Sequence, residues 1–162
     1  MTKTSITRAS AQLKAMGLIK EENFGREIRM TTLAKGKELF EMARKYLINP
    51  VQSRIQVTDV KDVEKMLVAG ESALSMQSML AAPKHDIYAI YKGDEIVESL
   101  SSINQQWEGE NGYYEIELWK YNPKLIAGQS TVDIVSLAMS LSDNEDERVQ
   151  GELEELLEEY SW

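Results

Sequence analysis

The sequence contains no cysteine and a single histidine, His85, among its 162 residues. The lack of cysteine excludes disulfide bonds and thiolate metal sites, and it favours a reducing, cytoplasmic location. A lone histidine with no cysteine beside it is a poor basis for a zinc site. We therefore expect neither a metal nor a cofactor.

Long apolar runs and catalytic motifs are also missing. No apolar segment approaches the about 20 residues of a membrane-spanning helix. The opening Met-Thr-Lys-Thr-Ser has none of the apolar character of a signal peptide. The sequence shows neither a phosphate-binding glycine loop nor a nucleophile elbow. We expect a cytoplasmic protein that does not enter a membrane and is not an enzyme.

Charge is distributed unevenly along the chain, whose formal net charge is −9. Residues 1–55 hold eleven Lys and Arg against five Glu, whereas the remainder holds seven Lys and Arg against 22 Asp and Glu. Such segregation predicts a basic contact surface joined to an acidic body. The plainer alternative is chance clustering of like charges.

The first fifty residues show a recognisable order of periodic segments. An apolar residue recurs every three or four positions at Ile6, Ala9, Leu13 and Met16. This spacing predicts an amphipathic helix over residues 4–16. Two strands are expected at 18–21 and 27–30, with Gly25 in the hairpin turn between them. A long helix should then run from Thr32 to about Leu47, on which Leu33 and Phe40 are apolar.

The rest of the chain alternates between short strands and helices. Strands are expected at 54–57, 87–91 and 114–121, and helices at 59–68, 72–80, 94–104, 132–141 and from 142 onward. We therefore expect an α+β protein with two domains: a partial winged helix over residues 1–50, and a small mixed sheet packed with helices over 51–162.

Three side-chain groups in the second half have two interpretations each. Glu115 and Glu117 share a strand face and are interpreted as its solvent-facing side, with a carboxylate pair for magnesium as the alternative. Met66, Met76 and Met79 are interpreted as core residues, with an adaptable binding groove as the alternative. The aromatic residues of this region are expected in the core, or else around a small-molecule pocket: Trp107, Tyr113, Tyr114, Trp119 and Tyr121.

The first predicted helix meets the requirements of a helix that reads the DNA major groove. Such a helix needs small or hydrogen-bonding side chains off its apolar stripe. The candidate DNA-binding residues here and on the hairpin are Lys3, Ser5, Thr7, Arg8, Gln12, Lys14, Arg26 and Arg29. Arg8 suits guanine and Gln12 suits adenine, while the lysines suit phosphates. The alternative is an ordinary amphipathic helix and hairpin whose basic residues are merely solvated.

These residues also carry a family resemblance over positions 2–47. The pattern Ser5-Ile6-Thr7-Arg8-x4-Leu13-x3-Gly17-Leu18-Ile19, followed by Arg26, Arg29 and Gly36, resembles the recognition helix, wing and next helix of MarR-type transcriptional regulators. The resemblance implies that Thr7, Arg8, Arg26 and Arg29 contact double-stranded DNA. That family has further helices ahead of the recognition helix. A longer protein, a second copy of the chain or a loss of DNA binding would each account for their absence here.

Residues 51–162 resemble, less specifically, a C-terminal extension of some bacterial winged-helix and antitoxin-like regulators. The resemblance rests on segments such as Ala69-Gly70-x-Ser72-Ala73-Leu74 and Glu147-Arg148-Val149, and it implies a sensing or partner-binding body. Our leading hypothesis is a bacterial transcriptional regulator that binds operator DNA as a homodimer. The rival is an antitoxin-like protein-interaction module, in which the acidic domain binds a basic protein and the DNA-binding element is vestigial.

Overall fold

The computed structural model describes residues 3–58, 63–100, 113–127 and 130–162, and the chain divides into two units. The first unit comprises Met1–Leu47 together with Ser161 and Trp162, and the second comprises Ile48–Tyr160. The sequence placed the boundary after Pro50 and assigned Ser161 and Trp162 to the second domain. The chain thus passes from one unit to the other twice.

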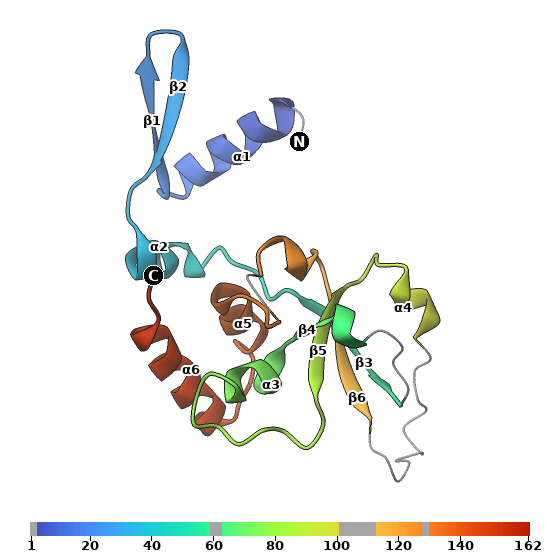
Figure 1. Cartoon of the computed structure of the whole chain (residues 1–162). Helices are drawn as coiled ribbons and strands as arrows, with labels where there is room; N and C mark the ends of the chain where they lie inside the picture. The colour runs from blue at the N-terminus through green and yellow to red at the C-terminus, as the bar shows by residue number, and fades with distance from the viewer. Residues whose placement is uncertain (1–2, 59–62, 101–112, 128–129) are drawn as a thin grey trace. The chain divides into compact units, whose positions relative to one another are not determined.

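The first unit contains a helix, a hairpin and a second helix (Figure 1). Helix α1 (Lys3–Ala15) is followed by Gly17 at φ +71°, a conformation that glycine adopts without strain. Strands β1 (Ile19–Phe24) and β2 (Glu27–Thr32) pair antiparallel, from Ile19 opposite Thr32 to Phe24 opposite Glu27. Only two residues, Gly25 and Arg26, join the strands, so the hairpin is longer and its turn tighter than expected.

Helix α2 (Gly36–Arg44) is shorter than the predicted helix over 32–47. Thr32 pairs with Ile19 in the hairpin, so it cannot begin the helix. Leu33, expected on the buried face, is 53% exposed, whereas Phe40 is buried. The expected apolar stripe of α1 is also largely uncovered, because Ile6 and Leu13 are 47% and 39% exposed. The predicted long helix over 32–47 was therefore wrong in its bounds.

The C-terminus anchors α2 within the first unit. The ring of Trp162 stacks on Phe40, with centroids 5.1 Å apart. Gly36 sits at the start of α2 with φ +55°, and a β-carbon there would lie 2.8 Å from the Trp162 Cβ. Residue 36 has to be glycine for both reasons, the backbone conformation and the close approach of the tryptophan.

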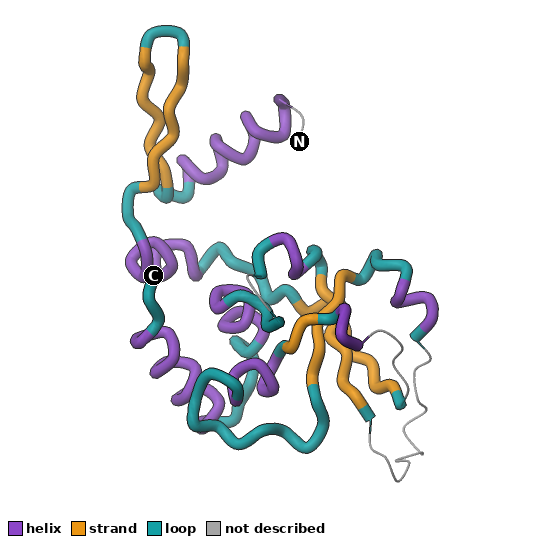
Figure 2. The backbone as a smooth tube through the Cα atoms, viewed as in Figure 1, coloured by secondary structure: helices purple, strands orange, loops and turns teal. Residues whose placement is uncertain are grey.

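The second unit is built on a four-stranded mixed sheet (Figure 2). Its strands are β3 (Val51–Val57), β4 (Leu67–Val68), β5 (Ile87–Tyr91) and β6 (Tyr114–Trp119). In the order β3-β6-β5-β4, the central pair β5 and β6 is parallel and the outer pairs are antiparallel. The chain is therefore a mixed α+β protein with one small antiparallel sheet and one mixed sheet.

Helices cover both faces of the mixed sheet. Figure 1 shows α3 (Gly70–Ser75), α5 (Ile134–Ser140) and α6 (Glu147–Glu159) along one face and α4 (Ile96–Ser99) beside the other. On the α4 face, Val57, Met66, Ile90 and Ile116 form a buried cluster. Trp119 is fully buried on the face of β6 opposite to Ile116.

Several predicted helices differ from the structure. The predicted helix over 59–68 ends instead in a 3-10 turn, η1 (Val63–Lys65), and strand β4, while residues 59–62 lie outside the described residues. Helices α3 and α4 are shorter than predicted, and residues 101–104 are again outside the described range. A further 3-10 turn, η2 (Pro123–Leu125), follows β6. Among the described residues, no helix combines the length and apolar character needed to cross a bilayer.

Candidate functional site

The polar side chains of α1 lie on two different faces of the helix. Ser5, Arg8 and Gln12 are exposed, and their spacing of three and four residues places them on one face, called the reading stripe below. Thr7 and Lys14 are also exposed, but they lie about 140° farther around the axis at 3.6 residues per turn. Lys3 is the first residue of α1. A single DNA groove edge can therefore meet the reading stripe directly, while Thr7 and Lys14 face a different direction.

Lys14 is turned toward the hairpin. Its Nζ lies 3.0 Å from Glu21 Oε2 on β1, and the lysine side chain is 57% exposed. An ion pair this exposed contributes only ~0–1 kcal/mol to stability, so a phosphate can replace the carboxylate at little cost. This position suits a residue that contacts the DNA backbone and carries no sequence information.

The hairpin holds its two arginines in different ways. Arg26 occupies the exposed two-residue turn. Arg29 lies on β2 with its Cζ 4.3 Å from the centroid of the Phe24 ring, and that ring is 59% exposed. This cation–π contact keeps the guanidinium near the hairpin tip. The sequence did not single out Phe24; the signal was available, because cross-strand pairing places Phe24 diagonally opposite Arg29.

The basic excess of the first unit comes from α1 and from Lys35 and Lys45, which flank α2, because α2 itself holds two basic residues against two glutamates. Helix α1 contains Lys3, Arg8 and Lys14 and no acidic residue. The hairpin balances three basic residues against three glutamates, and one of these pairs, Lys20 with Glu22, is 2.9 Å apart. The positive potential is therefore strongest around α1, and the hairpin offers individual arginines at its tip.

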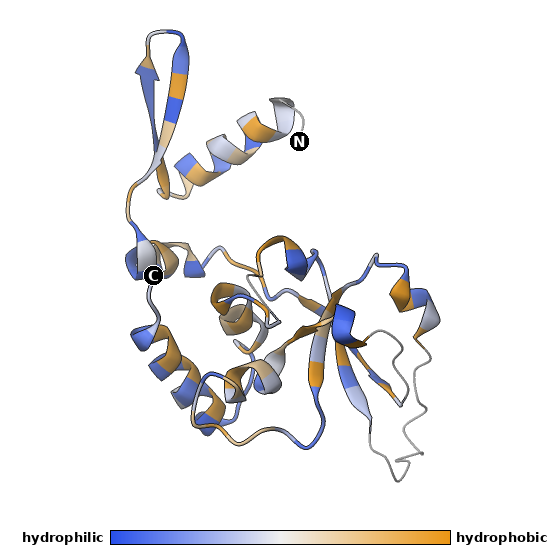
Figure 3. Cartoon of the chain, viewed as in Figure 1, coloured by the Kyte–Doolittle hydropathy of each residue, from blue (hydrophilic) through white to orange (hydrophobic). Residues whose placement is uncertain are grey.

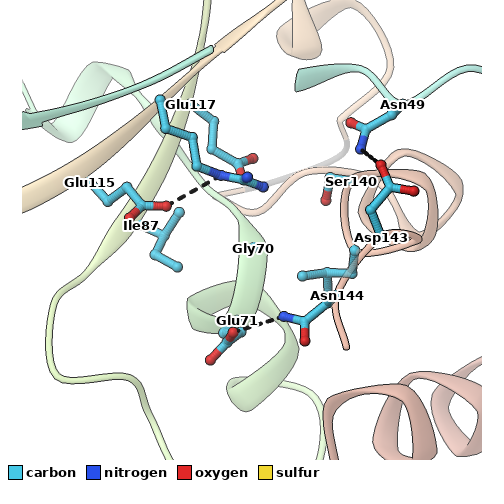
Figure 4. A pocket seen from close by; sticks show the side chains of 11 residues that line it. Asn49, Gly70, Glu71, Ile87, Glu115, Glu117, Ser140, Asp143 and Asn144 are labelled. Atoms are coloured by element: carbon cyan, nitrogen blue, oxygen red, sulfur yellow. Dashed lines mark hydrogen bonds and ion pairs between the residues drawn. The ribbon is translucent and has the colours of Figure 1, made fainter. Parts of the chain in front are cut away.

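A second polar region lies in the second unit, where Glu117 is 1% exposed (Figure 4). Its Oε1 accepts hydrogen bonds from Arg54 Nη2 at 2.9 Å and Arg54 Nε at 3.1 Å, and its Oε2 accepts one from Trp119 Nε1 at 2.9 Å. The prediction that this strand face is solvent-facing is therefore wrong for Glu117. The helices on that face cover it, and Arg54 sits directly opposite Glu117 in the sheet register.

Burial changes the acidity of this carboxyl group. Removal from water raises the pKa of Glu117, because the charged form loses its hydration. The hydrogen bond from Trp119 and the charge and hydrogen bonds of Arg54 oppose that rise without cancelling it. The carboxyl group therefore holds its proton more tightly in the folded chain than in water.

A cavity of about 350 Å³ opens beside this ion pair. Its lining includes the carboxylates of Glu71, Glu115, Glu117 and Asp143, with Arg54 as its basic residue. Several of these groups satisfy one another: Asn144 donates to Glu71 at 3.0 Å, and Asn49 donates to Asp143 at 3.2 Å. Excess carboxylate repels phosphate, so this cavity does not suit a nucleic acid or a nucleotide. In the part of the chain that the structure describes, no group of His, Cys, Asp or Glu is arranged to hold a metal ion.

The chain matches no protein family, no curated protein and no solved structure. Of the two polar regions, the α1–hairpin surface presents cations and hydrogen-bonding groups to solvent, whereas the cavity presents mainly acceptors that already have partners. The α1–hairpin surface is the stronger candidate.

Proposed function

We propose that the chain is a DNA-binding transcriptional regulator, in which α1 enters the major groove and the hairpin lies on the flanking groove or phosphates. The observation that carries the proposal is the exposed reading stripe of Ser5, Arg8 and Gln12, on a helix without acidic residues. Directly after that helix comes a hairpin with Arg26 at its tip. This order supports a winged-helix type of DNA contact.

The chemistry of each residue suggests a separate task. Arg8 has the planar fork that hydrogen-bonds O6 and N7 of guanine, and Gln12 matches N6 and N7 of adenine. Lys14 exchanges Glu21 for a phosphate, and Thr7 shares that side of the helix. Arg26 and Arg29 reach the backbone or the minor groove beside the site. Sequence preference is then assigned to the reading stripe and general affinity to the other residues.

The proposal includes a homodimer. Two copies related by a twofold axis would place two α1 helices on half-sites about one helical turn of DNA apart. Sedimentation equilibrium of the full chain, with and without DNA, tests this part separately. A monomer in both conditions would remove the dimer from the proposal and leave the DNA contact to be judged by the next experiment.

The test starts by selecting duplexes from a pool with a randomised centre, using the purified full chain. Binding of the selected duplex is then measured by fluorescence anisotropy for the wild type, Arg8→Ala and Lys14→Ala. We expect Arg8→Ala to lose ~1–3 kcal/mol of binding free energy and to relax preference at one base pair. Lys14→Ala should weaken all duplexes alike, because it removes a phosphate contact.

Lys124→Ala is the matched control, because it removes one exposed positive charge from the second unit. It should leave both affinity and preference unchanged. Failure to enrich any duplex, or equal losses for all three variants, would contradict the proposal. Equal losses would mean that only the net charge of the chain matters.

A further inference from the structure

Two exposed methionines follow helix α3 in the second unit. Met76 is 63% exposed and Met79 is 91% exposed, whereas Met66 is buried in the sheet core. The sequence assigned all three to the core, which is right for Met66 and wrong for the other two. Apolar side chains this exposed are unfavourable in water, so their burial against a partner would be favourable.

The turn that carries these methionines is tied to its surroundings. The backbone N–H of Met79 donates to Glu152 Oε2 on α6 at 2.9 Å. The side-chain amide of Gln77 donates to the carbonyl oxygen of Ala73 at 3.1 Å. The backbone N–H of Gln77 donates to the carbonyl oxygen of Leu74 at 2.9 Å. The methionines therefore project from a fixed backbone, so their exposure is built into the fold.

Helix α6 supplies the other wall of a groove beside this turn. Glu152, Glu155 and Glu159 follow one another at three- and four-residue spacing, so they lie on one face of α6 together with the half-buried Leu156. Val149, Leu153 and Leu157, on the adjoining face of α6, enter the core. Figure 3 shows this alternation of polar and apolar residues along α6.

The resulting groove encloses about 330 Å³ and is defined by eight residues: Met76, Gln77, Ser78, Met79, Glu152, Glu155, Leu156 and Glu159. Below it is called the Met–Glu groove. Its apolar part comes from methionine and leucine, and its rim carries three glutamates; none of the described residues that line it is basic. Nucleic acid is a poor occupant, because its phosphates would face these glutamates.

We propose that the Met–Glu groove binds a basic amphipathic segment of a partner protein. Lysine or arginine side chains of the segment would meet Glu152, Glu155 and Glu159, and its apolar side chains would cover Met76 and Met79. Methionine suits this task, because its unbranched, polarisable side chain adapts to different apolar partners. The second unit contains 22 Asp and Glu against eight Lys and Arg, which attracts a basic partner from a distance. This interaction goes beyond the proposed DNA contact and does not depend on it.

The test titrates the full chain with a synthetic peptide of Leu and Lys at helical spacing, about 16 residues long, or four helical turns. A second peptide with Glu in place of every Lys is the counterpart. The readout is the set of methionine methyl signals in a ¹³C NMR spectrum, assigned by single Met→Leu variants. We expect the signals of Met76 and Met79 to shift with the basic peptide and that of Met66 to stay in place. The acidic peptide should shift none of them.

Two double variants separate specific binding from general attraction to an acidic protein. Glu155→Gln/Glu159→Gln removes two charges from the groove, and Glu154→Gln/Glu158→Gln removes two from elsewhere on α6. The first pair should lower the affinity for the basic peptide by a factor of about five or more, and the second pair should lower it by less than about twofold. Methionine signals that do not respond, or equal losses for the two pairs, would overturn the proposal.

One further outcome also counts against it. If the Met76 and Met79 signals move with protein concentration in the absence of peptide, a second copy of the chain occupies the groove. The basic first unit of that copy would then be the occupant, and a separate partner protein would be rejected. All these measurements omit DNA, so they fail or succeed independently of the proposed function.

Discussion

Glu117 shows how a buried acid is accommodated in a small sheet. Its two oxygens receive three hydrogen bonds, two from Arg54 and one from Trp119. Arg54 also approaches Glu115, with Nε 3.3 Å from Oε1. The arginine side chain is 48% exposed, so one end of the pair keeps its contact with water. The carboxylate lies away from water, and this burial raises the pKa of Glu117.

The raised pKa of Glu117 predicts a pH-dependent contribution to folding. The folded chain binds this proton more tightly than the unfolded chain, in which the glutamate has its ordinary pKa of 4.5. The stabilisation from this group is complete below that value and is lost as pH rises through the folded pKa. Glu117→Gln removes this titration. The free energy of unfolding of the variant should therefore rise relative to that of the wild type as pH increases through this window. Above the window the two curves of unfolding free energy against pH should run parallel. Urea unfolding of both proteins between pH 4 and 8 measures the difference.

The glutamine substitution should also have a constant cost of ~1–2 kcal/mol, because a single amide oxygen cannot accept from both Arg54 and Trp119. Glu154→Gln is the control, because Glu154 is exposed on α6. Glu154→Gln should change neither the free energy of unfolding nor its dependence on pH. A Glu117→Gln curve that falls relative to wild type with rising pH would show that the pKa is lowered instead.

At the scale of elements, the periodicity of apolar residues predicted the location of several helices and strands. The spacing of apolar residues located α1, and alternation located the hairpin and strands β5 and β6. The segment before Val68 failed, because it was predicted as a helix from a capping signal. Leu67 and Val68 instead pair with β5, a partner about twenty residues farther along the chain. Such pairing depends on tertiary context that local propensity does not contain.

The candidate DNA interface was predictable in composition but not in geometry. Spacing placed Ser5, Arg8 and Gln12 off the apolar stripe, and they are exposed. The pairing of Lys14 with Glu21 and the contact between Arg29 and Phe24 depend on how the hairpin packs and pairs, which spacing alone does not give. Glu117 was assigned to solvent for a related reason: alternation places it on a face, but the helices that bury this face are distant from β6 in the chain.

Two glycines in the first unit provide a matched pair for testing the anchor formed by the C-terminus. Gly25 and Gly36 both have positive φ, +62° and +55°, but only at Gly36 would a β-carbon meet Trp162. Gly25→Ala should cost ~1–2 kcal/mol from backbone strain alone. Gly36→Ala should cost ~1–3 kcal/mol more, because it also forces Trp162 away from Phe40. Thermal unfolding followed by near-ultraviolet circular dichroism measures both, and equal losses would mean that Trp162 does not pack there.

At the scale of the whole molecule, the charges of the two units oppose each other. The first unit holds ten Lys and Arg against five Glu, and the second holds eight against 22 acidic residues. A nucleic acid is therefore attracted by one unit and repelled by the other. If the proposed DNA contact exists, this arrangement would restrict it to the first unit. It also makes the proposed DNA affinity sensitive to ionic strength, because few contacts act against a net repulsion.

The slope of affinity against salt tests whether the hairpin tip takes part in that contact. Each phosphate neutralised by a cation contributes about −0.9 to the slope of log K against log salt concentration. If Arg26 meets a phosphate, Arg26→Ala should make the slope shallower by about one, because one fewer counterion is released. Lys124→Ala alters the net charge equally but lies in the second unit, so its slope should equal that of the wild type. Anisotropy titrations at several salt concentrations give all three slopes, and an unchanged slope for Arg26→Ala would remove Arg26 from the proposed contact.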